Sequence, residues 1–185
     1  MYDLGKMKEK LTFLQYKTLK EIRRIIDLSG LDYENIRDVD KNARTPVLHN
    51  IKDQIVRSEV IMEYTIIDEF LNSMIANYYF GKSKTFIQLW KTKRFKLFNY
   101  YILEELSLLK KLSLCKEIKK IPKSIVEKIT KINALRNGLA HAFFPQNLKR
   151  SKPIYRGKDI FTPEGFELFG EDAEKIHKFF FKLLF

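Results

Sequence analysis

The sequence predicts an all-α protein, and three observations support this fold class. Apolar residues recur at intervals of three and four positions through several long segments, which is the spacing of one helical face. Glycine and proline fall between these segments, where one helix ends and the next can begin. The chain has 185 residues, of which 45% are hydrophobic, enough for one well-filled core. We expect a bundle of four to five helices over residues 49–185, preceded by an N-terminal helix and connector over residues 1–48.

The N-terminal extension is expected to begin with a helix over residues 6–28. Leucine and isoleucine recur there at helical spacing, and Ser29-Gly30 follows as a stop signal. Residues 31–50 mix Asp, Asn and Arg without clear periodicity and contain the step Thr45-Pro46. We interpret this second stretch as a connector. The sequence leaves open whether residues 1–48 belong to the bundle or cover a site on it.

The first helix of the bundle is expected over residues 51–80, because apolar residues follow the helical spacing and Gly81 stands where a helix stop is expected. Its polar side includes Glu69 and Asn72. These two are candidates to support a site on a neighbouring helix, provided that they face it. The alternative is that they belong to an ordinary solvated face.

A further helical region is expected from Ser83 or Lys84 toward Leu114, with a kink near Thr92-Lys93-Arg94. A break follows at Ile121-Pro122. Proline is harmless at the first position of a helix, where its missing N–H has no intrahelical partner, so the next helix is expected to begin there.

The remainder of the chain is expected to contain a polar connector and a last helix. The connector covers residues 146–163, with a short extended piece around Ile154-Tyr155 and Asp159-Ile-Phe. The last helix is expected over residues 171–184. Its apolar residues should pack inward: Ile176, Phe179, Phe180 and Leu183.

A cation, an amide and an imidazole come together late in the helix that follows Pro122, as Arg136, Asn137 and His141. Asn137 and His141 are four positions apart and share a helical face, and the long arm of Arg136 can swing into the same groove. These residues lie off the apolar stripe, so packing alone does not explain them. Pro145 then closes the helix.

Gly138 lies inside this segment, although glycine costs about 1 kcal/mol relative to alanine within a helix. Its presence suggests that another backbone or a ligand approaches closely. A second subunit is one such neighbour.

The segment Arg136-Asn137-Gly138-Leu139-Ala140-His141 resembles the Arg-Asn-x-x-x-His signature of the HEPN superfamily, small all-helical domains that are often metal-independent ribonucleases or toxins. The helix from Glu63 to Tyr79 is similar to the family's acidic, Leu/Ile-rich helix. The resemblance covers roughly residues 50–185. It implies an endoribonuclease that uses no metal or other cofactor, in a toxin or phage-defence setting, with an antitoxin or another protein as a partner.

Metal-free cleavage of RNA needs a base for the ribose 2′-hydroxyl, an acid for the leaving 5′-oxygen and a cation for the charge gathering on phosphorus. His141 titrates near neutrality and can transfer the proton. Arg136 presents a fork of donors that matches phosphate oxygens. Asn137 is expected to orient one of the two by hydrogen bonding.

One Arg and one His per chain supply half of a symmetric site. Two chains that meet across a twofold axis at this helix can provide both protonation roles, so we expect a homodimer. The resemblance implies the same arrangement, and with it products that carry a 2′,3′-cyclic phosphate and a 5′-hydroxyl.

A second hypothesis comes from a different class of protein. Arg and His at a helix end can cap carbonyl groups or bridge to an acidic neighbour, and many HEPN-like domains have lost catalysis. The chain would then be a non-catalytic module or regulator that binds RNA or a protein, and Arg136 and His141 would serve structure.

A basic connector follows the motif, and its side chains are candidates for RNA contacts. The cations can track a phosphate backbone, and the tyrosine can stack on an unpaired base. An ordinary solvated loop is an equally good interpretation. The residues concerned are Lys149, Arg150, Lys152, Tyr155, Arg156 and Lys158.

The overall charge also favours a polyanionic partner. The chain has 35 Lys and Arg against 23 Asp and Glu, a formal net charge of +12. Phosphate contacts that release counterions would use this excess. The same excess fits a lysine-rich solvated surface, and it does not distinguish RNA from DNA or anionic lipid.

The cysteine content and the start of the chain bear on its compartment. The single cysteine, Cys115, excludes an internal disulfide framework and fits a reducing compartment. Residues 1–10 are charged from the start, unlike a signal peptide, and no window approaches the ~18 apolar residues of a membrane span. We expect a cytoplasmic protein with no membrane partner. The two other histidines, His49 and His177, are more typical of surface or satisfied residues, and no sequence motif indicates a metal or nucleotide site.

Overall fold

The computed structural model describes the greater part of the chain and divides it into two units, residues 1–54 and 55–185. Most of the helix expected over residues 6–28 lies outside the described residues. So does all of residues 141–152, which includes part of the basic connector. The described residues are 12, 13, 15–18, 20, 21, 25, 36–81, 86–140 and 153–184.

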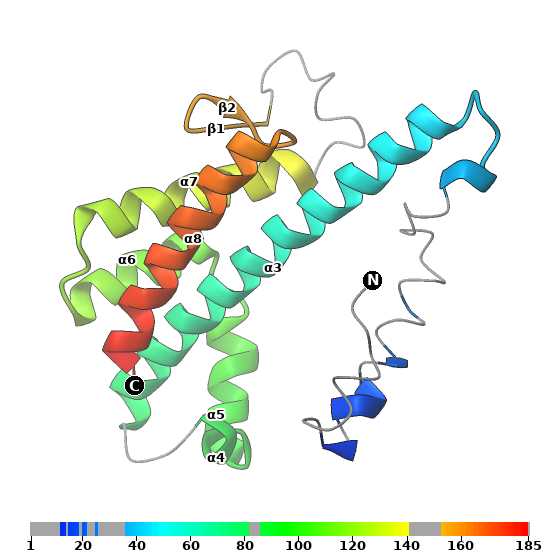
Figure 1. The fold of residues 1–185 in the computed structure, drawn as a ribbon. Coiled ribbons are helices and arrows are strands. Elements are labelled where there is room, and N and C mark those ends of the chain that lie inside the picture. The colour runs from blue at the N-terminus through cyan, green and yellow to red at the C-terminus, as the bar shows by residue number, and fades with distance from the viewer. Residues whose placement is uncertain are drawn as a thin grey trace. The chain divides into compact units, whose positions relative to one another are not determined.

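The predicted all-α class is confirmed: in the described ranges, helices dominate and the sheet is a single two-stranded hairpin (Figure 1). None of the described helices combines the length and the apolar character that crossing a bilayer requires. The elements are the 3₁₀-helix η2 (Ile36–Asp38), the α-helices α3 (Arg44–Phe80), α4 (Phe86–Trp90), α5 (Lys93–Phe98), α6 (Leu108–Ile118), α7 (Lys123–Ala140) and α8 (Pro163–Leu184), the π-helix η3 (Asn99–Leu103), and the strands β1 (Ile154–Tyr155) and β2 (Lys158–Asp159).

Helix α3 begins at Arg44, so the expected connector over residues 31–50 is wrong in its last part. Pro46 lies in the first turn of the helix, where the missing N–H has no intrahelical partner and proline is tolerated. The Arg44 side chain folds back on the preceding segment, with Nε donating to the Val39 carbonyl at 3.0 Å and Nη2 to the Arg37 carbonyl at 2.7 Å. The proline therefore marks a helix start rather than a break.

The region expected as one kinked helix from residue 83 or 84 to Leu114 is divided into shorter helices. The kink expected near Thr92 is a full break, because the Thr92 hydroxyl accepts a hydrogen bond from the Phe95 N–H and caps α5. A second break separates η3 from α6. There the buried Asn99 amide donates to Glu104 Oε1 at 2.6 Å, within a π-type turn.

Helix α8 begins at Pro163, eight residues before the expected start at residue 171. Thr162 precedes it and accepts a hydrogen bond from the Gly165 N–H at 3.2 Å, in the manner of an N-cap residue. A Cβ on Gly165 would collide with the Asp159 carbonyl of β2, so this position requires glycine. The glycine at this position allows the helix to start against the hairpin. The inward packing expected of Ile176 and Phe180 is confirmed, since both are fully buried.

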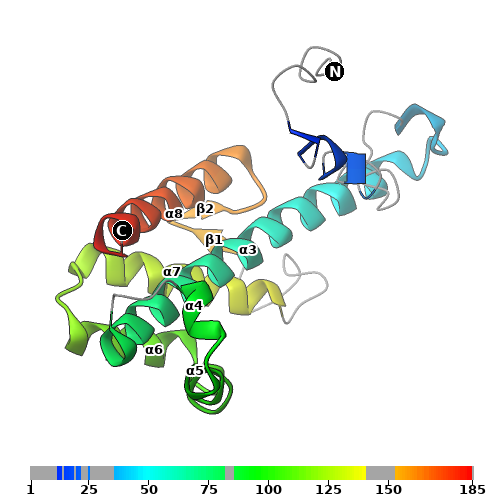
Figure 2. The same ribbon diagram turned by 90° about the horizontal axis from the view of Figure 1, so that it is seen from below.

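Within the unit 55–185, helix α3 contacts α6, α7 and α8. Leu71 of α3 meets Cys115 of α6, and Phe70 stacks on Phe180 of α8 with ring centres 5.4 Å apart. Helices α3 and α8 run side by side in the same direction in both ribbon views (Figures 1 and 2). The aliphatic residues of these helices form the main core, and α4 and α5 enclose a second cluster around Phe95.

Cys115 lies in the core on α6, and its thiol is fully buried. Burial raises the pKa of this thiol to about 12, against a smaller lowering by the Lys111 charge. We expect the native protein to react very slowly with a thiol reagent at pH 8, because the thiolate is the reactive form. Complete reaction after unfolding in urea is the control, and fast labelling of the folded protein would contradict the burial. Since the folded pKa lies above the ordinary 9.0, this group's contribution to stability should be present below pH 9 and decline toward pH 12.

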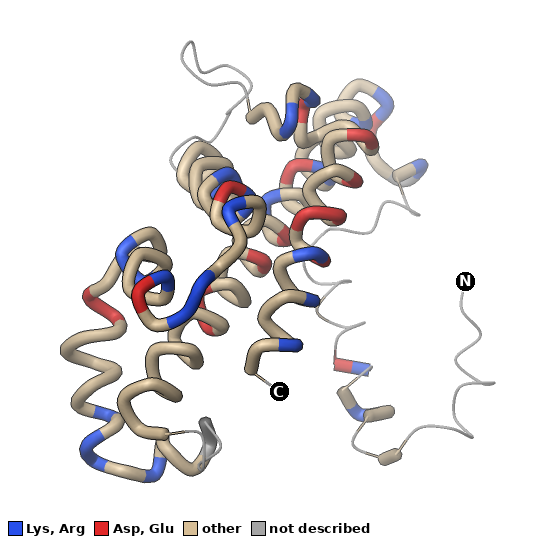
Figure 3. Tube along the Cα trace, turned by 90° about the vertical axis from the view of Figure 1, so that its left-hand side faces the viewer, with Lys and Arg blue, Asp and Glu red and all other residues tan. Residues whose placement is uncertain are grey.

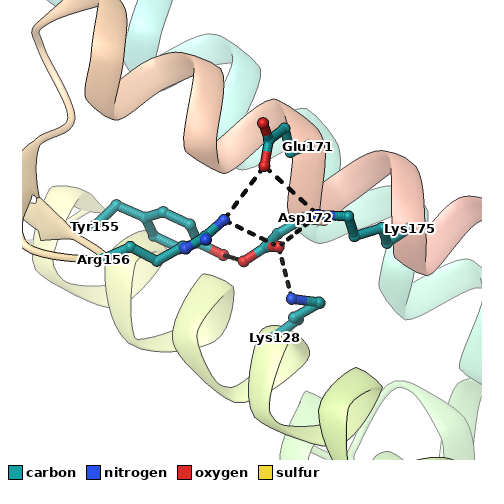
Figure 4. A network of polar contacts seen from close by, with 6 residues as sticks. All are labelled: Lys128, Tyr155, Arg156, Glu171, Asp172 and Lys175. Atoms are coloured by element: carbon teal, nitrogen blue, oxygen red, sulfur yellow. Dashed lines mark hydrogen bonds and ion pairs between the residues drawn. The ribbon is translucent and has the colours of Figure 1, made fainter.

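The hairpin packs on α8 and α7 through one buried carboxylate, that of Asp172 (Figure 4). Arg156 and Gly157 form its turn with positive φ angles of 49° and 84°, the conformation that two-residue hairpins favour. Asp172 is 1% exposed and lies 2.7 Å from Lys128 Nζ of α7 and 3.2 Å from the Tyr155 hydroxyl of β1. Asp172 thus joins α7, α8 and the hairpin.

Candidate functional site

The last turns of α7 present Arg136 and Asn137 away from the core. Leu135 and Leu139 of the same helix are buried, Asn137 is exposed, and Arg136 is partly buried. The Arg136 guanidinium carbon lies 4.7 Å from the centre of the Tyr64 ring on α3, a cation–π distance. Arg136 Nη1 donates to Asn137 Oδ1 at 3.1 Å. The guanidinium is therefore held in place both by a ring and by an amide.

The Tyr64 side chain is partly buried between α3 and α7. Burial raises the pKa of its hydroxyl, the nearby Asp68 carboxylate raises it further, and the Arg136 charge opposes both. The hydroxyl stays protonated at neutral pH, so Tyr64 offers Arg136 a neutral ring. No sequence pattern indicated this residue, because the two positions meet only when α3 and α7 pack together.

The Arg136 guanidinium retains hydrogen-bonding capacity. Its Nε is buried and has no hydrogen-bond partner in the part of the chain that the structure describes. A guanidinium has five N–H donors, and buried donors are usually satisfied. Arg136 as a whole is only partly buried, so we expect the other N–H groups of the guanidinium to bind an external acceptor such as a phosphate oxygen.

Arg57 fixes the end of α7, a role that the sequence did not reveal. Its Nη1 donates to the Leu139 carbonyl at 2.6 Å, two residues before His141. Carbonyls in the last turn of a helix have no intrahelical partner, and a cation there also interacts favourably with the helix dipole. The contact spans 82 positions of sequence, beyond the reach of any local pattern.

His141, the expected proton-transfer residue, lies outside the described residues, directly after the last residue of α7. Lys149, Arg150 and Lys152 of the basic connector lie outside them as well. Of the three motif residues, the structure therefore describes Arg136 and Asn137 but not His141. The role of the third stays a prediction.

Gly138 does not make the expected close approach with any described residue. A Cβ added there would meet no described atom within 4 Å. The glycine instead lines a cavity of about 310 Å³ between α7 and the hairpin, with Lys131, Leu135, Pro153, Ile154 and Arg156 among the other lining residues. In the described part of the chain, this side of α7 leaves room for a neighbouring molecule.

Tyr155 is not a base-stacking platform, contrary to expectation. It is 2% exposed, and its ring packs edge-on against Phe169 with ring centres 5.7 Å apart. Its hydroxyl contacts Asp172, and burial, followed by the charge of that carboxylate, raises its pKa. Arg156 lies beside the same carboxylate at 3.5 Å, and Lys158 remains exposed in β2. The sequence suggested an exposed tyrosine because the surrounding residues are basic.

Glu69 and Asn72 do not contact Arg136. They lie one to two turns further along α3 than Tyr64, the residue that does. They line a groove of about 580 Å³ that Tyr64 also lines, so the groove begins beside the Arg136 site. The remaining lining residues are Asp68 of α3, Trp90 of α4, Asn99 of η3, Glu104, Glu105, Leu106 and Ser107 of the following turn, and Lys111 of α6.

The other two histidines, His49 and His177, both lie within the described residues. His177 Nε2 on α8 is 2.7 Å from Glu63 Oε2 on α3, and its ring meets Phe70 edge-on. His49 is exposed near the start of α3. Figure 3 shows basic and acidic positions interleaved along the helices of residues 55–185.

Comparison with models of protein families, with curated proteins and with solved structures found no match for this chain. In the described ranges, no three His, Cys, Asp or Glu side chains are grouped so as to hold a metal ion. The resemblance to the HEPN superfamily therefore rests on the sequence motif.

Proposed function

We propose that this chain is a HEPN-type endoribonuclease that cleaves RNA without a metal ion, at a site completed by a second copy of the chain. One observation carries the proposal. Arg136 is held by Tyr64 and Asn137 at the end of α7, five positions before His141, and its Nε has no hydrogen-bond partner among the described residues. A fixed cation close in sequence to a histidine supplies the two kinds of group that metal-free phosphodiester cleavage needs.

Arg136 binds the scissile phosphate and the charge that develops on it. Its guanidinium is planar and offers donors in parallel pairs, which fit two phosphate oxygens. The Tyr64 ring and the Asn137 amide fix the plane before substrate arrives, so little reorganisation is needed during the reaction.

His141 transfers the protons. One imidazole accepts the proton of the ribose 2′-hydroxyl, that oxygen attacks phosphorus, and a second imidazole gives a proton to the leaving 5′-oxygen. One chain carries one such histidine, so the second comes from a partner chain across a twofold axis at the end of α7. Asn137 is exposed, and no described atom lies within 4 Å of a Cβ placed on Gly138; both observations support an approach of another chain there.

The biological setting is part of the same proposal. An RNase of this type acts as a toxin or in defence against phage, and an antitoxin or other protein partner holds it in check. The net charge of +12 supports RNA as the substrate, because the long-range field favours association with a polyanion.

The test is incubation of the full chain with total RNA in excess chelator. We expect fragments from the wild type and none above background from His141→Ala. His49→Ala is the matched control, since it removes an exposed histidine remote from the motif in sequence, and it should cleave at the wild-type rate. Cleavage by His141→Ala at the wild-type rate would refute the proposed role.

A non-catalytic module that binds RNA or a protein is the second candidate. It is favoured by the contacts that Arg136 already makes within its own chain, which can serve to hold α7 against α3. This candidate requires stable binding to RNA or to a specific protein without turnover. A wild-type chain that binds RNA tightly and leaves it intact in the same assay would select it.

A further inference from the structure

The groove that begins at Tyr64 is rich in hydrogen-bond acceptors. Asp68 and Glu69 on α3 and Glu104 and Glu105 before α6 contribute four carboxylates to its lining. Glu69, Glu104 and Glu105 are exposed. A ligand that presents several N–H groups would suit this lining, and a phosphate would be repelled by it.

Two nitrogen donors also line the groove, Lys111 of α6 and Asn99 of η3. Each is already bonded to a carboxylate that lines the same groove. Lys111 Nζ is 2.6 Å from Asp68 Oδ2, and Asn99 Nδ2 is 2.6 Å from Glu104 Oε1. Both Lys111 and Asn99 are buried, so these pairs are fixed parts of the wall. What the groove offers to a ligand is therefore mainly acceptors.

A second, independent observation points to a ligand. Asn72 is 6% exposed, and its Nδ2 points to Asp68 Oδ2 at 3.4 Å and Glu69 Oε1 at 3.5 Å. The two carboxylates fix the orientation of the amide, which leaves Oδ1 buried without a partner in the described part of the chain. Leaving a buried polar atom unsatisfied costs free energy, so a donor supplied from outside would stabilise the groove floor.

We propose that this groove binds the base of a guanine nucleotide of the RNA substrate, with Glu69, Glu105 and Asn72 accepting hydrogen bonds from its Watson–Crick edge. Guanine carries two adjacent donors there, N1–H and the 2-amino group, which match the two oxygens of a carboxylate. Adenine and cytosine place a ring acceptor beside their amino group, and uracil flanks its single N–H with two carbonyls. An acceptor-lined groove therefore selects guanine over the other three bases.

The position of the groove connects it to the cleavage site. Tyr64 lines the groove and also contacts Arg136, so a nucleotide with its phosphate on Arg136 can direct its base into the groove. Trp90 also lines the groove and contributes an aromatic ring to it. This assignment rests on the proposed function, in which Arg136 binds the scissile phosphate. It adds to that function a preference for guanine next to the bond that is cleaved.

The test is a binding measurement by calorimetry on the full chain with four probes: GMP, IMP, AMP and UMP. We expect GMP to bind about tenfold more tightly than AMP or UMP, because a matched pair of hydrogen bonds gives discrimination of that order. IMP lacks the 2-amino group and should be intermediate. Equal affinity for all four nucleotides would overturn the assignment.

Two variants locate the effect in the groove. Glu69→Gln and Glu105→Gln each place an amide where a carboxylate stood, and the pair should remove the preference for GMP over AMP. Glu174→Gln is the matched control, because Glu174 is exposed on α8 and pairs with its helix neighbour Lys178. A GMP preference that persists in the double variant would show that guanine binds elsewhere.

The outcomes separate this inference from the proposed function. Binding needs no turnover, so a GMP preference without RNA cleavage would support the groove and count against the nuclease. RNA cleavage without a preference for guanine in binding, or at the cut, would retain the nuclease and overturn the groove.

Discussion

Arg136→Ala should lower the rate of RNA cleavage by about 100- to 1,000-fold, the loss typical for removal of one preorganised donor to a developing charge. The guanidinium is held near the end of α7 by Tyr64 and Asn137. Without it, the phosphate loses both its binding partner and the charge that stabilises the transition state. Single-turnover cleavage of a labelled RNA measures the effect.

The matched control for this variant is Arg94→Ala. Arg94 is another arginine over an aromatic ring, 5.3 Å from the centre of Phe80, and it is exposed on α5. It should leave the rate unchanged, apart from a small loss of affinity for RNA. Arg136→Lys keeps the charge but loses the planar fork, so its rate should fall between those of the wild type and Arg136→Ala. A folded Arg136→Ala that cleaves at the wild-type rate would refute the role of the guanidinium.

Asp172→Ala should reduce the free energy of unfolding by about 3 to 5 kcal/mol, the range for removal of one partner from a buried ion pair. The variant leaves Lys128 Nζ and the buried Tyr155 hydroxyl without the carboxylate that both contact (Figure 4). It also releases Arg156, which lies 3.5 Å from the same oxygen as Lys128. Urea unfolding followed by circular dichroism measures the loss.

Glu174→Ala is the comparison for that measurement. Glu174 lies two positions along α8 and forms an exposed pair with Lys178 at 2.7 Å. Solvent and salt screen such a pair, so its removal should leave the unfolding midpoint essentially unchanged. Equal midpoints for Asp172→Ala and the wild type would contradict the view that this carboxylate joins α7, α8 and the hairpin.

The sequence was a good guide to helices whose ends carry unambiguous signals. The break at Pro122, the stop at Gly81 and the burial of Ile176 and Phe180 all follow from local spacing and from the geometry of proline and glycine. The starts of α3 and α8 were missed for a related reason. Pro46 and Pro163 each lie in a first turn, and a proline in that position looks like a break when only the sequence is considered.

Contacts between segments that are distant in sequence limited how much of the candidate site could be predicted from the sequence. The motif spacing was enough to place Arg136 and Asn137 on one turn of one helix. The Tyr64 ring beneath Arg136 and the Arg57 cap on α7 depend on how α3 and α7 pack, which no local pattern encodes. The burial of Tyr155 depends in the same way on Asp172, a residue of another element.

The most direct measurement is the chemistry of the RNA ends that the wild-type chain produces in excess chelator. Attack by the neighbouring 2′-hydroxyl leaves a 2′,3′-cyclic phosphate on one fragment and a 5′-hydroxyl on the other, and the proposed function requires both. Fragments that end in a 3′-hydroxyl and a 5′-phosphate, or no fragments beyond those of His141→Ala, would contradict it.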